Sequence, residues 1–318
     1  MKILLFGKNG QVGWELQRSL ALLGEVVALD ARSPAPLHAD FRDPESLATI
    51  IRAVAPDVII NAAAYTAVDK AEAESELAFR INAEAPGVLA QAAAARSAWL
   101  VHYSTDYVFD GSGNAPWSEE SVPKPLSVYG RSKLEGETLI RAAGCRHLIF
   151  RTSWVYAARG SNFAKTMLRL AAERAAISVI DDQVGTPTGA ELLADLTSLA
   201  LRQVATRPEL AGTYHAVASG ETSWYGYAQH VIEFARRHGE PIRVAADAVR
   251  AIPTSSYPLP AQRPLNSRLD AGKLCRAFGV RLPPWQAGID RMLDEILATS
   301  RAPTTSTAAT ATTTQQIA

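Results

Sequence analysis

The stretch KILLFGKNGQVGWELQRSL, residues 2–20, decides the fold that this sequence predicts. An apolar run passes directly into a turn that carries Gly7, Gly10 and Gly13, and a helical pattern follows the turn. Glycines at such a turn allow tight curvature and let a pyrophosphate approach the positive end of the helix. The GxxGxxG spacing differs from the usual GxGxxG fingerprint, but the strand before it and the helix after it indicate a dinucleotide site.

Short apolar runs alternate with helical patterns through the first half of the chain. Continuous apolar runs are typical of strands that are covered on both faces of a parallel sheet. This alternation predicts an α/β fold with a Rossmann-type, doubly wound parallel sheet. We expect strands at 2–6, 25–29, 57–61, 98–104 and 147–153, and helices at 11–23, 44–55, about 68–95 and 128–142.

The second half of the chain is less regular. We expect helices near 162–175, 190–203, 224–239 and 284–298, strands at 177–181 and 212–217, and an extended or looped segment at 252–266, which contains four prolines. Residues 1–155 should mainly form an NAD(P)-binding domain, and residues 156–298 a smaller C-terminal substrate-binding lobe interleaved with it. The low-complexity segment 301–318 predicts a disordered tail.

Composition excludes several functional classes. Lys plus Arg and Asp plus Glu number 32 each, so no net charge attracts nucleic acid or an anionic membrane. The two cysteines, Cys145 and Cys275, lie far apart and predict neither a disulfide framework nor a metal site, which favours a cytoplasmic location. No signal peptide or run long enough to span a bilayer is present. We therefore expect a soluble protein.

Several residues after the expected strands are candidates for cofactor binding. Asp30 follows Gly13 by 17 residues, which is near where an acid binds the ribose hydroxyls of a dinucleotide. Arg32 could instead neutralise the 2′-phosphate of NADP, so the sequence leaves the choice between NADH and NADPH open. Asp40 and Phe41, a short polar-apolar pair after an expected third strand that precedes the one at 57–61, could flank the adenine. Asp43 and its neighbours could instead simply cap the next helix, and both interpretations are kept.

The stretch DVIINAAAYT, residues 57–66, places small residues after a strand. A cofactor can lie against the backbone there, because ligands bind at the carboxyl edge of an open parallel sheet. Asn82 and Asp69 on the expected following helix either hold this loop or are solvated helix residues.

Tyr129 and Lys133 stand four residues apart on an expected helix, so they project from the same face. An ammonium beside a phenol stabilises the phenolate and lowers the pKa of the tyrosine. Thr105, at the end of an expected strand, falls at the same carboxyl edge and could donate a second hydrogen bond. A Tyr-x-x-x-Lys spacing is also common on solvated helix faces, but together with Thr105 and the glycine-rich turn it indicates proton donation to a carbonyl.

Seven strings over roughly residues 1–298 resemble the dTDP-4-dehydrorhamnose reductase family of the extended short-chain dehydrogenase/reductase superfamily. The strings are GKNGQVGWELQRSL, NAAAYTAVDKAE, YSTDYVFDG, VYGRSKLEGE, RTSWVYAARGSNFAKTMLRLA, DDQVGTPTGAELLADL and RPLNSRLD. The resemblance implies NAD(P)H-dependent reduction of the C4 ketone of dTDP-4-dehydro-L-rhamnose. That reaction is the last step of dTDP-rhamnose biosynthesis, which supplies cell-surface polysaccharides such as lipopolysaccharide.

The resemblance also implies roles for individual residues. Tyr129 would donate a proton to O4, Lys133 would hold the nicotinamide ribose, and Thr105 would replace the catalytic serine of the superfamily. Thr105 with Asp106 and Trp154 would contact the substrate; Trp154 could equally pack between the lobes. Tyr65 departs from the histidine common in the family. The implied cofactor contacts are Gly7, Gly10, Gln11, Val12, Gly13, Asp30, Asp40, Phe41, Ala64, Tyr65, Thr66, Tyr129 and Lys133.

The family further implies a homodimer and bound Mg²⁺, with Glu15 and Glu191 as the matching positions, although both could be exposed carboxylates. Two other functions remain open. A related sugar-nucleotide epimerase would use the same Thr, Tyr and Lys, whereas a dehydratase would need an Asp-Glu pair after Thr105, and here Asp106 is followed by Tyr107. A non-catalytic regulatory subunit on the same fold would not require the three catalytic side chains.

Overall fold

In the computed structural model, a six-stranded parallel sheet forms the centre of the protein, in the order β10-β5-β4-β3-β1-β2. The structure describes residues 1–301, with only the backbone for 299–301, so the predicted tail beyond Arg301 lies outside the described residues. The strands are β1 (Lys2–Phe6), β2 (Glu25–Leu29), β3 (Val58–Asn61), β4 (Trp99–Thr105), β5 (Arg146–Thr152) and β10 (Gly212–His215). The predicted α/β fold with a Rossmann-type sheet is confirmed.

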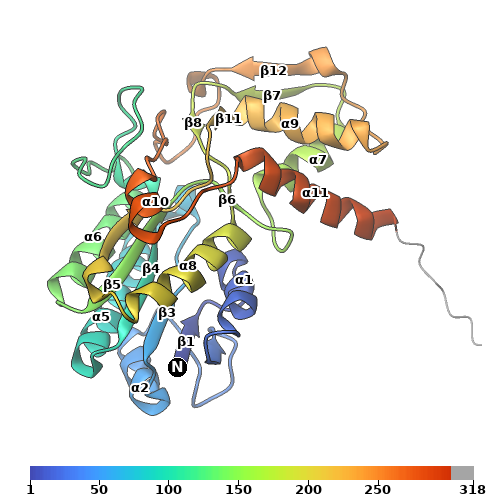
Figure 1. Ribbon diagram of the computed structural model, residues 1–318. Helices are drawn as coiled ribbons and strands as arrows, with labels where there is room; N and C mark the ends of the chain where they lie inside the picture. Colours follow the sequence, from blue (N-terminus) through green and yellow to red (C-terminus); the bar gives the residue numbers. More distant parts are fainter. Residues whose placement is uncertain (302–318) are drawn as a thin grey trace, which may run out of the picture.

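Helices cover both faces of this sheet (Figure 1). The helices α1 (Gln11–Leu20) and α8 (Ala190–Val204) pack together on one face, and α2 (Pro44–Val54), α5 (Ala85–Arg96) and α6 (Val128–Ala142) cover the other. Strand residues alternate between the two layers: Ile3 and Leu5 pack in the core with α1 and α8, whereas Leu4 and Phe6 pack in the core with α2 and α5. This two-sided burial explains the unbroken apolar runs in the sequence.

Two expectations for the first half are wrong in detail. The single helix expected at about 68–95 is divided into α3 (Val68–Ala71), α4 (Ser75–Phe79), a π-helical turn η1 (Arg80–Glu84) and α5. Glu72, in the break, accepts a hydrogen bond from Val128 N at 2.8 Å. The third strand expected before Asp40 does not form, because Ala39 N bonds to Asp30 O and the segment folds back in turns.

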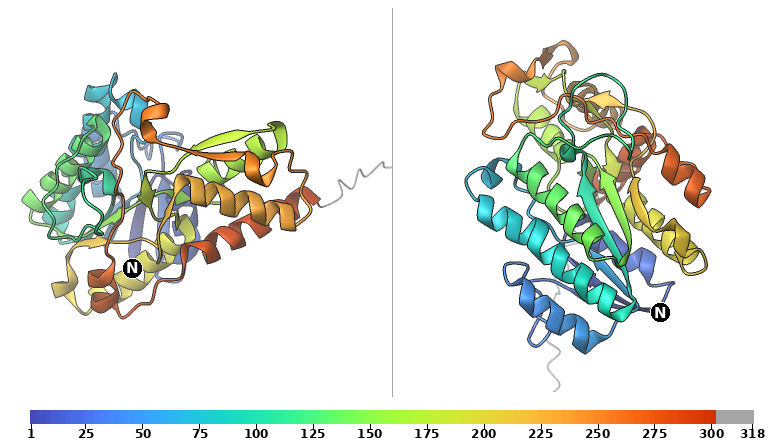
Figure 2. Two further views of the ribbon diagram at one scale, coloured as in Figure 1. Left: turned by 90° about the horizontal axis from the view of Figure 1, so that it is seen from above. Right: turned by 90° about the vertical axis from the view of Figure 1, so that its left-hand side faces the viewer.

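A smaller lobe stands over the carboxyl edge of the sheet (Figure 1). It contains α7 (Phe163–Glu173), α9 (Trp224–Arg237) and α11 (Trp285–Arg301), with β7 (Ile177–Ile180) paired to β12 (Val249–Ile252). Its own core includes Met167, Tyr227 and Trp285. Figure 2, seen from above, shows α9 and α11 side by side. Sequence patterns missed β12 and α10 (Gly272–Phe278), which are only four and seven residues long.

Short elements complete the chain between these larger ones. Two short strand pairs lie where the sheet and the smaller lobe meet: β6 pairs with β9 in parallel, and β8 pairs with β11 antiparallel. Among the described residues, no helix is long and apolar enough to cross a membrane. The short elements are β6 (Val155–Tyr156), β8 (Val184–Gly185), β9 (Thr188–Gly189), β11 (Thr222–Ser223), η2 (Asp106–Val108), η3 (Pro208–Leu210), η4 (Ala246–Ala248) and η5 (Thr254–Ser256).

Candidate active site

The glycine-rich turn brings β1, α1 and β3 into close contact. Gly7 has a φ of +87°, and a Cβ atom there would lie 2.7 Å from the carbonyl carbon of Ala62. A Cβ atom on Gly13 would lie only 2.0 Å from Gly7 O. Gly10 is the N-terminal cap residue of α1 and has no side chain to block the helix end. The turn therefore requires glycine for packing at Gly7 and Gly13, and it leaves the start of α1 accessible at Gly10.

A cavity of about 660 Å³ opens beside this turn. It is bounded by the start of α1, the loop after β3, the ends of β4 and β5, and the face of α6 that carries Tyr129 and Lys133. Gly7, Gly13, Asp30, Asp40, Phe41 and Tyr65 do not line it. The lining residues are Asn9, Gly10, Gln11, Val12, Ala62, Ala64, Thr66, Tyr103, Ser104, Tyr129, Lys133, Thr152, Val155, Arg159 and Gly160.

Two buried polar atoms of the cavity lining have no protein partner. Gln11 Oε1 and Thr152 Oγ1 are both buried, and neither makes a hydrogen bond. Because an unpaired buried polar atom is costly, such atoms fit a polar ligand in the cavity. Thr152 was not predicted, although it is the register partner of Thr105 on the next strand. The rule that ligands bind at the carboxyl edge could have identified it.

The residues predicted to bind the adenosine half lie outside this lining. Asp30 accepts hydrogen bonds from Arg32 N at 2.9 Å and from the Asn9 side chain. Burial opposes its ionised form, but these bonds keep the pKa of Asp30 below its ordinary value. Asp40 forms a bidentate ion pair with Arg42, with Nη2 to Oδ2 at 2.6 Å. That bond, opposed by desolvation, lowers the pKa of Asp40.

Phe41 and Asp43 have mainly local roles in this structure. Phe41 is 7 % exposed and packs edge-on against Phe6 in the core. Asp43 is the N-cap residue of α2, as expected, but its side chain makes no capping hydrogen bond. Adenine contacts by Asp40 and Phe41 therefore remain predictions.

Asn82 holds the loop after β3. Its side chain accepts from Tyr65 N at 2.9 Å and donates to Tyr65 O at 3.0 Å and to Ser132 Oγ at 3.1 Å. The phenol of Tyr65 points away to Glu74, so only the loop backbone and small side chains face the cavity. Asp69, the other residue considered for this role, instead pairs with Arg263 at 2.7 Å.

Tyr129, Thr105 and Asp106 meet beside the cavity. Burial raises the pKa of the Tyr129 phenol to about 12, against a hydrogen bond with Thr105 that lowers it. Thr105 donates to Asp106 Oδ1 at 3.1 Å, and the Ser267 hydroxyl also faces this carboxylate, whose Oδ2 is buried and makes no close hydrogen bond. Burial raises the pKa of Asp106 to about 6. The predicted lowering of the Tyr129 pKa is thus not observed.

The orientation of Lys133 explains this difference. Its Nζ donates to Tyr103 O at 2.6 Å and lies 3.1 Å from His102 Nε2, so residues of β4 hold the amino group. Lys133 is 2 % exposed, and burial lowers its pKa to about 8, with Glu137 opposing that shift.

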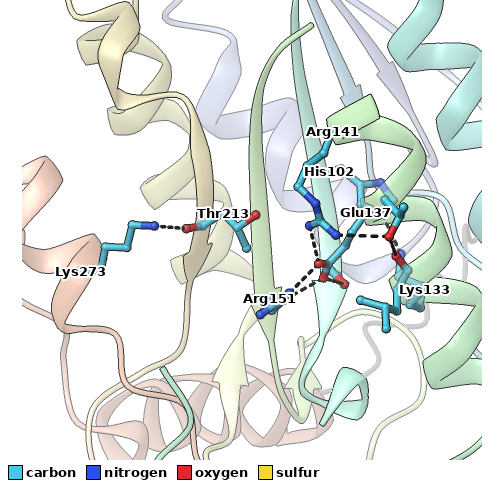
Figure 3. A network of polar contacts seen from close by, with 10 residues as sticks. His102, Lys133, Glu137, Arg141, Arg151, Thr213 and Lys273 are labelled. Atoms are coloured by element: carbon cyan, nitrogen blue, oxygen red, sulfur yellow. Dashed lines mark hydrogen bonds and ion pairs between the residues drawn. The ribbon is translucent and has the colours of Figure 1, made fainter. Parts of the chain in front are cut away.

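Glu137, one helical turn after Lys133, anchors α6 to the sheet. Figure 3 shows it between the guanidinium groups of Arg141 and Arg151. Arg151 donates to both carboxylate oxygens, at 2.9 and 2.7 Å. Arg141 adds a bond at 3.0 Å, and Ser104 adds one at 2.6 Å. Burial disfavours the carboxylate, but these bonds hold the pKa of Glu137 below its ordinary value. The sequence did not predict this cluster.

Trp154, the predicted substrate contact, has a φ of +49°, which is unusual for a residue with a side chain. Its indole stacks on Trp224 with ring centroids 3.7 Å apart. Trp224 lines a second cavity, of about 640 Å³, which also includes Arg169, Arg174 and Arg263. Trp154 therefore packs between the sheet and the smaller lobe and lies next to a cavity with cationic residues.

The residues implied for Mg²⁺ do not form a metal centre within the described part of this chain. No group of three His, Cys, Asp or Glu side chains there could hold a metal ion. Glu15 lies 3.5 Å from Arg18 and Glu191 lies 3.7 Å from Arg291. Burial raises the pKa of Glu191, and nearby carboxylates including Glu15 add to that effect against Arg291. The two carboxylates are thus neighbours, but the described residues do not fit a resident ion.

Arg159 is a further residue that the sequence analysis missed. It lines the 660 Å³ cavity next to Gly160. Its guanidinium lies 3.9 Å from the centre of the Trp14 ring on α1. The contact brings the loop after β6 over the start of α1. Nothing in the linear sequence indicated this contact.

Comparison with known proteins gives consistent results over almost the whole chain. A family model described as "RmlD substrate binding domain" matches residues 1–298. The dTDP-4-dehydrorhamnose reductase of Escherichia coli K12 is 54 % identical, covering 94 % of this chain and 99 % of that protein.

Two solved dTDP-4-dehydrorhamnose reductases have the same fold. The Clostridium acetobutylicum structure is 35 % identical with a TM-score of 0.83, covering 93 % of this chain and 100 % of that one. The Bacillus anthracis structure, a complex with NADP, is 33 % identical with a TM-score of 0.82, covering 92 % and 99 %.

Proposed function

The chain belongs to the dTDP-4-dehydrorhamnose reductase family, and we propose that it reduces the C4 ketone of dTDP-4-dehydro-L-rhamnose to give dTDP-L-rhamnose. One arrangement supports this most strongly. Tyr129, with Thr105 and Asp106 beside it, lines one cavity together with the start of α1, which follows the glycine-rich turn. A proton donor and a dinucleotide site thus lie at one carboxyl edge of the sheet.

The residues have separate tasks in this reaction. When bound, NAD(P)H supplies the hydride that goes to C4 of the sugar. Tyr129 donates its hydroxyl proton to O4, and the raised pKa of its phenol keeps that proton in place at neutral pH. Thr105 lies within hydrogen-bond reach of the phenol and orients it. The products are an alcohol, oxidised cofactor and a tyrosinate that regains a proton from solvent.

The unpartnered polar atoms support binding of both ligands. Gln11 Oε1 and Thr152 Oγ1 would accept hydrogen bonds from the cofactor, and Asp106 Oδ2 from a sugar hydroxyl. The second cavity, next to Trp154 and Trp224, would receive the nucleotide, with its arginines facing the diphosphate. In this division, residues 1–155 mainly bind the cofactor and 156–298 mainly bind the substrate.

Our proposal includes both NADPH and NADH as reductants. The Bacillus anthracis relative was solved with NADP. In this chain the Asp30 carboxylate would favour an unphosphorylated ribose, and Arg32 beside it would favour the 2′-phosphate. Comparison of kcat/KM for the two cofactors tests which residue prevails.

We also propose a homodimer in the cytoplasm, whose product serves cell-surface polysaccharides such as lipopolysaccharide. The thiols of Cys145 and Cys275 are both free, which suits a reducing compartment. Any Mg²⁺ would need ligands from a second subunit, because Glu15 and Glu191 supply too few for an ion that prefers six. Unchanged mass by light scattering and unchanged activity after exhaustive chelation would exclude a structural ion.

Oxidation of NADPH or NADH in the presence of dTDP-4-dehydro-L-rhamnose tests the proposed function directly. We expect one cofactor oxidised for each sugar reduced. An epimerase of the same superfamily retains its cofactor and would show no net oxidation, and a regulatory subunit would show no turnover. Tyr107, where dehydratases have a second carboxylate, argues against elimination.

A further inference from the structure

Three buried polar side chains, Asn61, His102 and Lys133, form a row that leads from β3 to the cavity, which Lys133 lines, and the mechanism above does not use Asn61 or His102. Asn61 ends β3, His102 is its register partner on β4, and Lys133 comes from α6. The three residues are 1 %, 1 % and 2 % exposed. Solvent therefore does not satisfy them, and their hydrogen bonds to one another determine where the protons lie.

The proton of the His102 ring can be assigned from its neighbours. Ala63 N–H donates to Asn61 Oδ1 at 3.1 Å, so the Asn61 amide nitrogen faces His102 Nδ1, 3.0 Å away. Nδ1 must then accept. Burial and Lys133 lower the pKa of His102 well below its ordinary value, so the ring is neutral. A neutral imidazole carries one proton, which is therefore on Nε2.

This assignment determines what Lys133 can be. His102 Nε2–H points at Lys133 Nζ, 3.1 Å away, and Nζ also donates to Tyr103 O at 2.6 Å. An ammonium has three donors and no lone pair, so it would meet Nε2–H donor to donor. An amine accepts from Nε2–H and still donates to Tyr103 O. The contacts from Asn61 through His102 and Lys133 to Tyr103 O are all hydrogen bonds only when Lys133 is an amine.

The other charged groups around Lys133 do not reverse this. Glu137, one turn along α6, is the carboxylate that favours the ammonium. It is already bound by Arg151 at 2.7 Å and by Arg141 at 3.0 Å. The Tyr129 phenol on the same helix is neutral, because burial raises its pKa to about 12.

We propose that Asn61 and His102 are positioning residues that favour the amine form of Lys133 in the ligand-free enzyme, so that NADPH binding at alkaline pH takes up a proton. The proposal rests on the proposed function to the extent that NADPH is the ligand whose ribose hydroxyls Lys133 would contact. Those hydroxyls can accept from an ammonium, whereas His102 Nε2–H cannot. Binding thus favours the protonated lysine, and the free enzyme favours the amine.

Asn61→Asp should reverse the direction of the hydrogen bonds from residue 61 through His102 to Lys133, because aspartate has the same shape as asparagine but only accepts. One aspartate oxygen accepts from Ala63 N–H, and the other accepts from a proton on His102 Nδ1. Nε2 then becomes an acceptor, and Lys133 can bond to it as an ammonium. Long-range ¹H–¹⁵N spectra of histidine-labelled, ligand-free protein report the ring tautomer, and loss of the signal in His102→Gln assigns it.

In the wild-type protein we expect the Nε2–H tautomer of His102, and in Asn61→Asp a proton on Nδ1. A wild-type ring protonated on Nδ1 overturns the proposal, even if the variant fails to fold. An identical tautomer in a folded variant also overturns it.

The second measurement is the dissociation constant of NADPH between pH 7 and 9.5. In the wild-type protein we expect it to rise with pH by up to about tenfold per unit, because proton uptake on binding becomes harder. In Asn61→Asp the rise should begin about one pH unit higher or more. A dissociation constant that is independent of pH, or the same profile in both proteins, contradicts the proposal. Neither measurement uses the sugar, so failure to reduce dTDP-4-dehydro-L-rhamnose would overturn the proposed function alone.

Discussion

Two groups of buried polar side chains at this site differ in how their hydrogen bonds are used. In the Glu137 cluster (Ser104, Glu137, Arg141 and Arg151) both carboxylate oxygens have donors within the protein. In the open edge (Gln11, Asp106 and Thr152) each residue keeps one buried oxygen without a partner. Both groups include residues at or directly after the ends of β4 and β5. The cluster stabilises the scaffold, whereas the open edge is complementary to ligands that the protein must bind.

Replacement of the proton donor should have the largest effect on activity. Tyr129→Phe removes the hydroxyl at the open edge and leaves the Glu137 cluster intact. We expect turnover to fall by about 10² to 10⁴, the range for loss of a positioned acid. NADPH binding, measured by fluorescence, should stay close to wild type. Tyr107→Phe, which alters a neighbouring phenol, is the matched control. Near-normal turnover in Tyr129→Phe would remove the basis of the mechanism.

A change in the cluster should act on stability instead. Glu137→Gln leaves the buried Arg151 without its carboxylate, and loss of one partner from a buried ion pair costs about 3 to 5 kcal/mol. The lowered pKa of Glu137 means that wild-type stability is present at neutral pH and declines as pH falls, and the variant lacks this dependence. Urea unfolding, with exposed Glu135→Gln as control, measures the effect. A loss of turnover without a loss of stability would contradict this role.

Asp106→Asn should have the opposite effect on stability. The pKa of Asp106 is raised from 3.8 to about 6, so the folded protein binds a proton more tightly than the unfolded chain. The wild type therefore loses stability as pH rises from about 4 through 6, whereas the variant does not ionise. At pH 8 we expect the variant to be more stable by on the order of 1 to 3 kcal/mol. Its KM for the sugar nucleotide should rise.

The comparison that decides this prediction is urea unfolding at pH 8 and at pH 4. The gain of Asp106→Asn should be present at pH 8 and absent at pH 4. A variant that is less stable than wild type at pH 8 would show that the Asp106 carboxylate stabilises the scaffold, as that of Glu137 does.

Arg141 marks the outer limit of the cluster and should have the smallest effect. Its side chain is 41 % exposed, and its pair with Glu137 is an i,i+4 contact on α6. Because solvent screens such pairs, Arg141→Ala should cost less than about 1 kcal/mol in the free energy of unfolding. A cost equal to that of Arg151→Ala, measured by the same urea titration, would contradict the distinction between buried and exposed partners.

The sequence predicted the sheet, because strands that are buried on both faces leave continuous apolar runs such as KILLF and DVIIN. It also predicted residues that lie beside the same cavity, including Gln11, Thr66 and Tyr129. The glycine spacing and the position of a residue directly after a strand both involve residues that are close together in the sequence, so a single sequence is enough to recognise them. Short elements such as β12 carry too few residues to show a period.

The remaining features arise only when distant segments meet. Asn61, His102 and Lys133 come from β3, β4 and α6, and their proton arrangement depends on a backbone N–H at Ala63. The expected effect of Lys133 on the Tyr129 pKa was wrong for the same reason: i,i+4 spacing places both residues on one helix face, but Lys133 Nζ contacts His102 and the backbone oxygen of Tyr103 on β4 instead. Such contacts leave no pattern in the linear sequence.

The most direct test of the central claim uses NADPH that carries deuterium at the transferable position of nicotinamide C4. After incubation with the enzyme and dTDP-4-dehydro-L-rhamnose, NMR locates the label in the product. We predict dTDP-L-rhamnose with deuterium on C4, and one NADPH oxidised for each sugar reduced. A product without the label, or a sugar altered without oxidation of NADPH, would contradict the assignment of this site as a reductase.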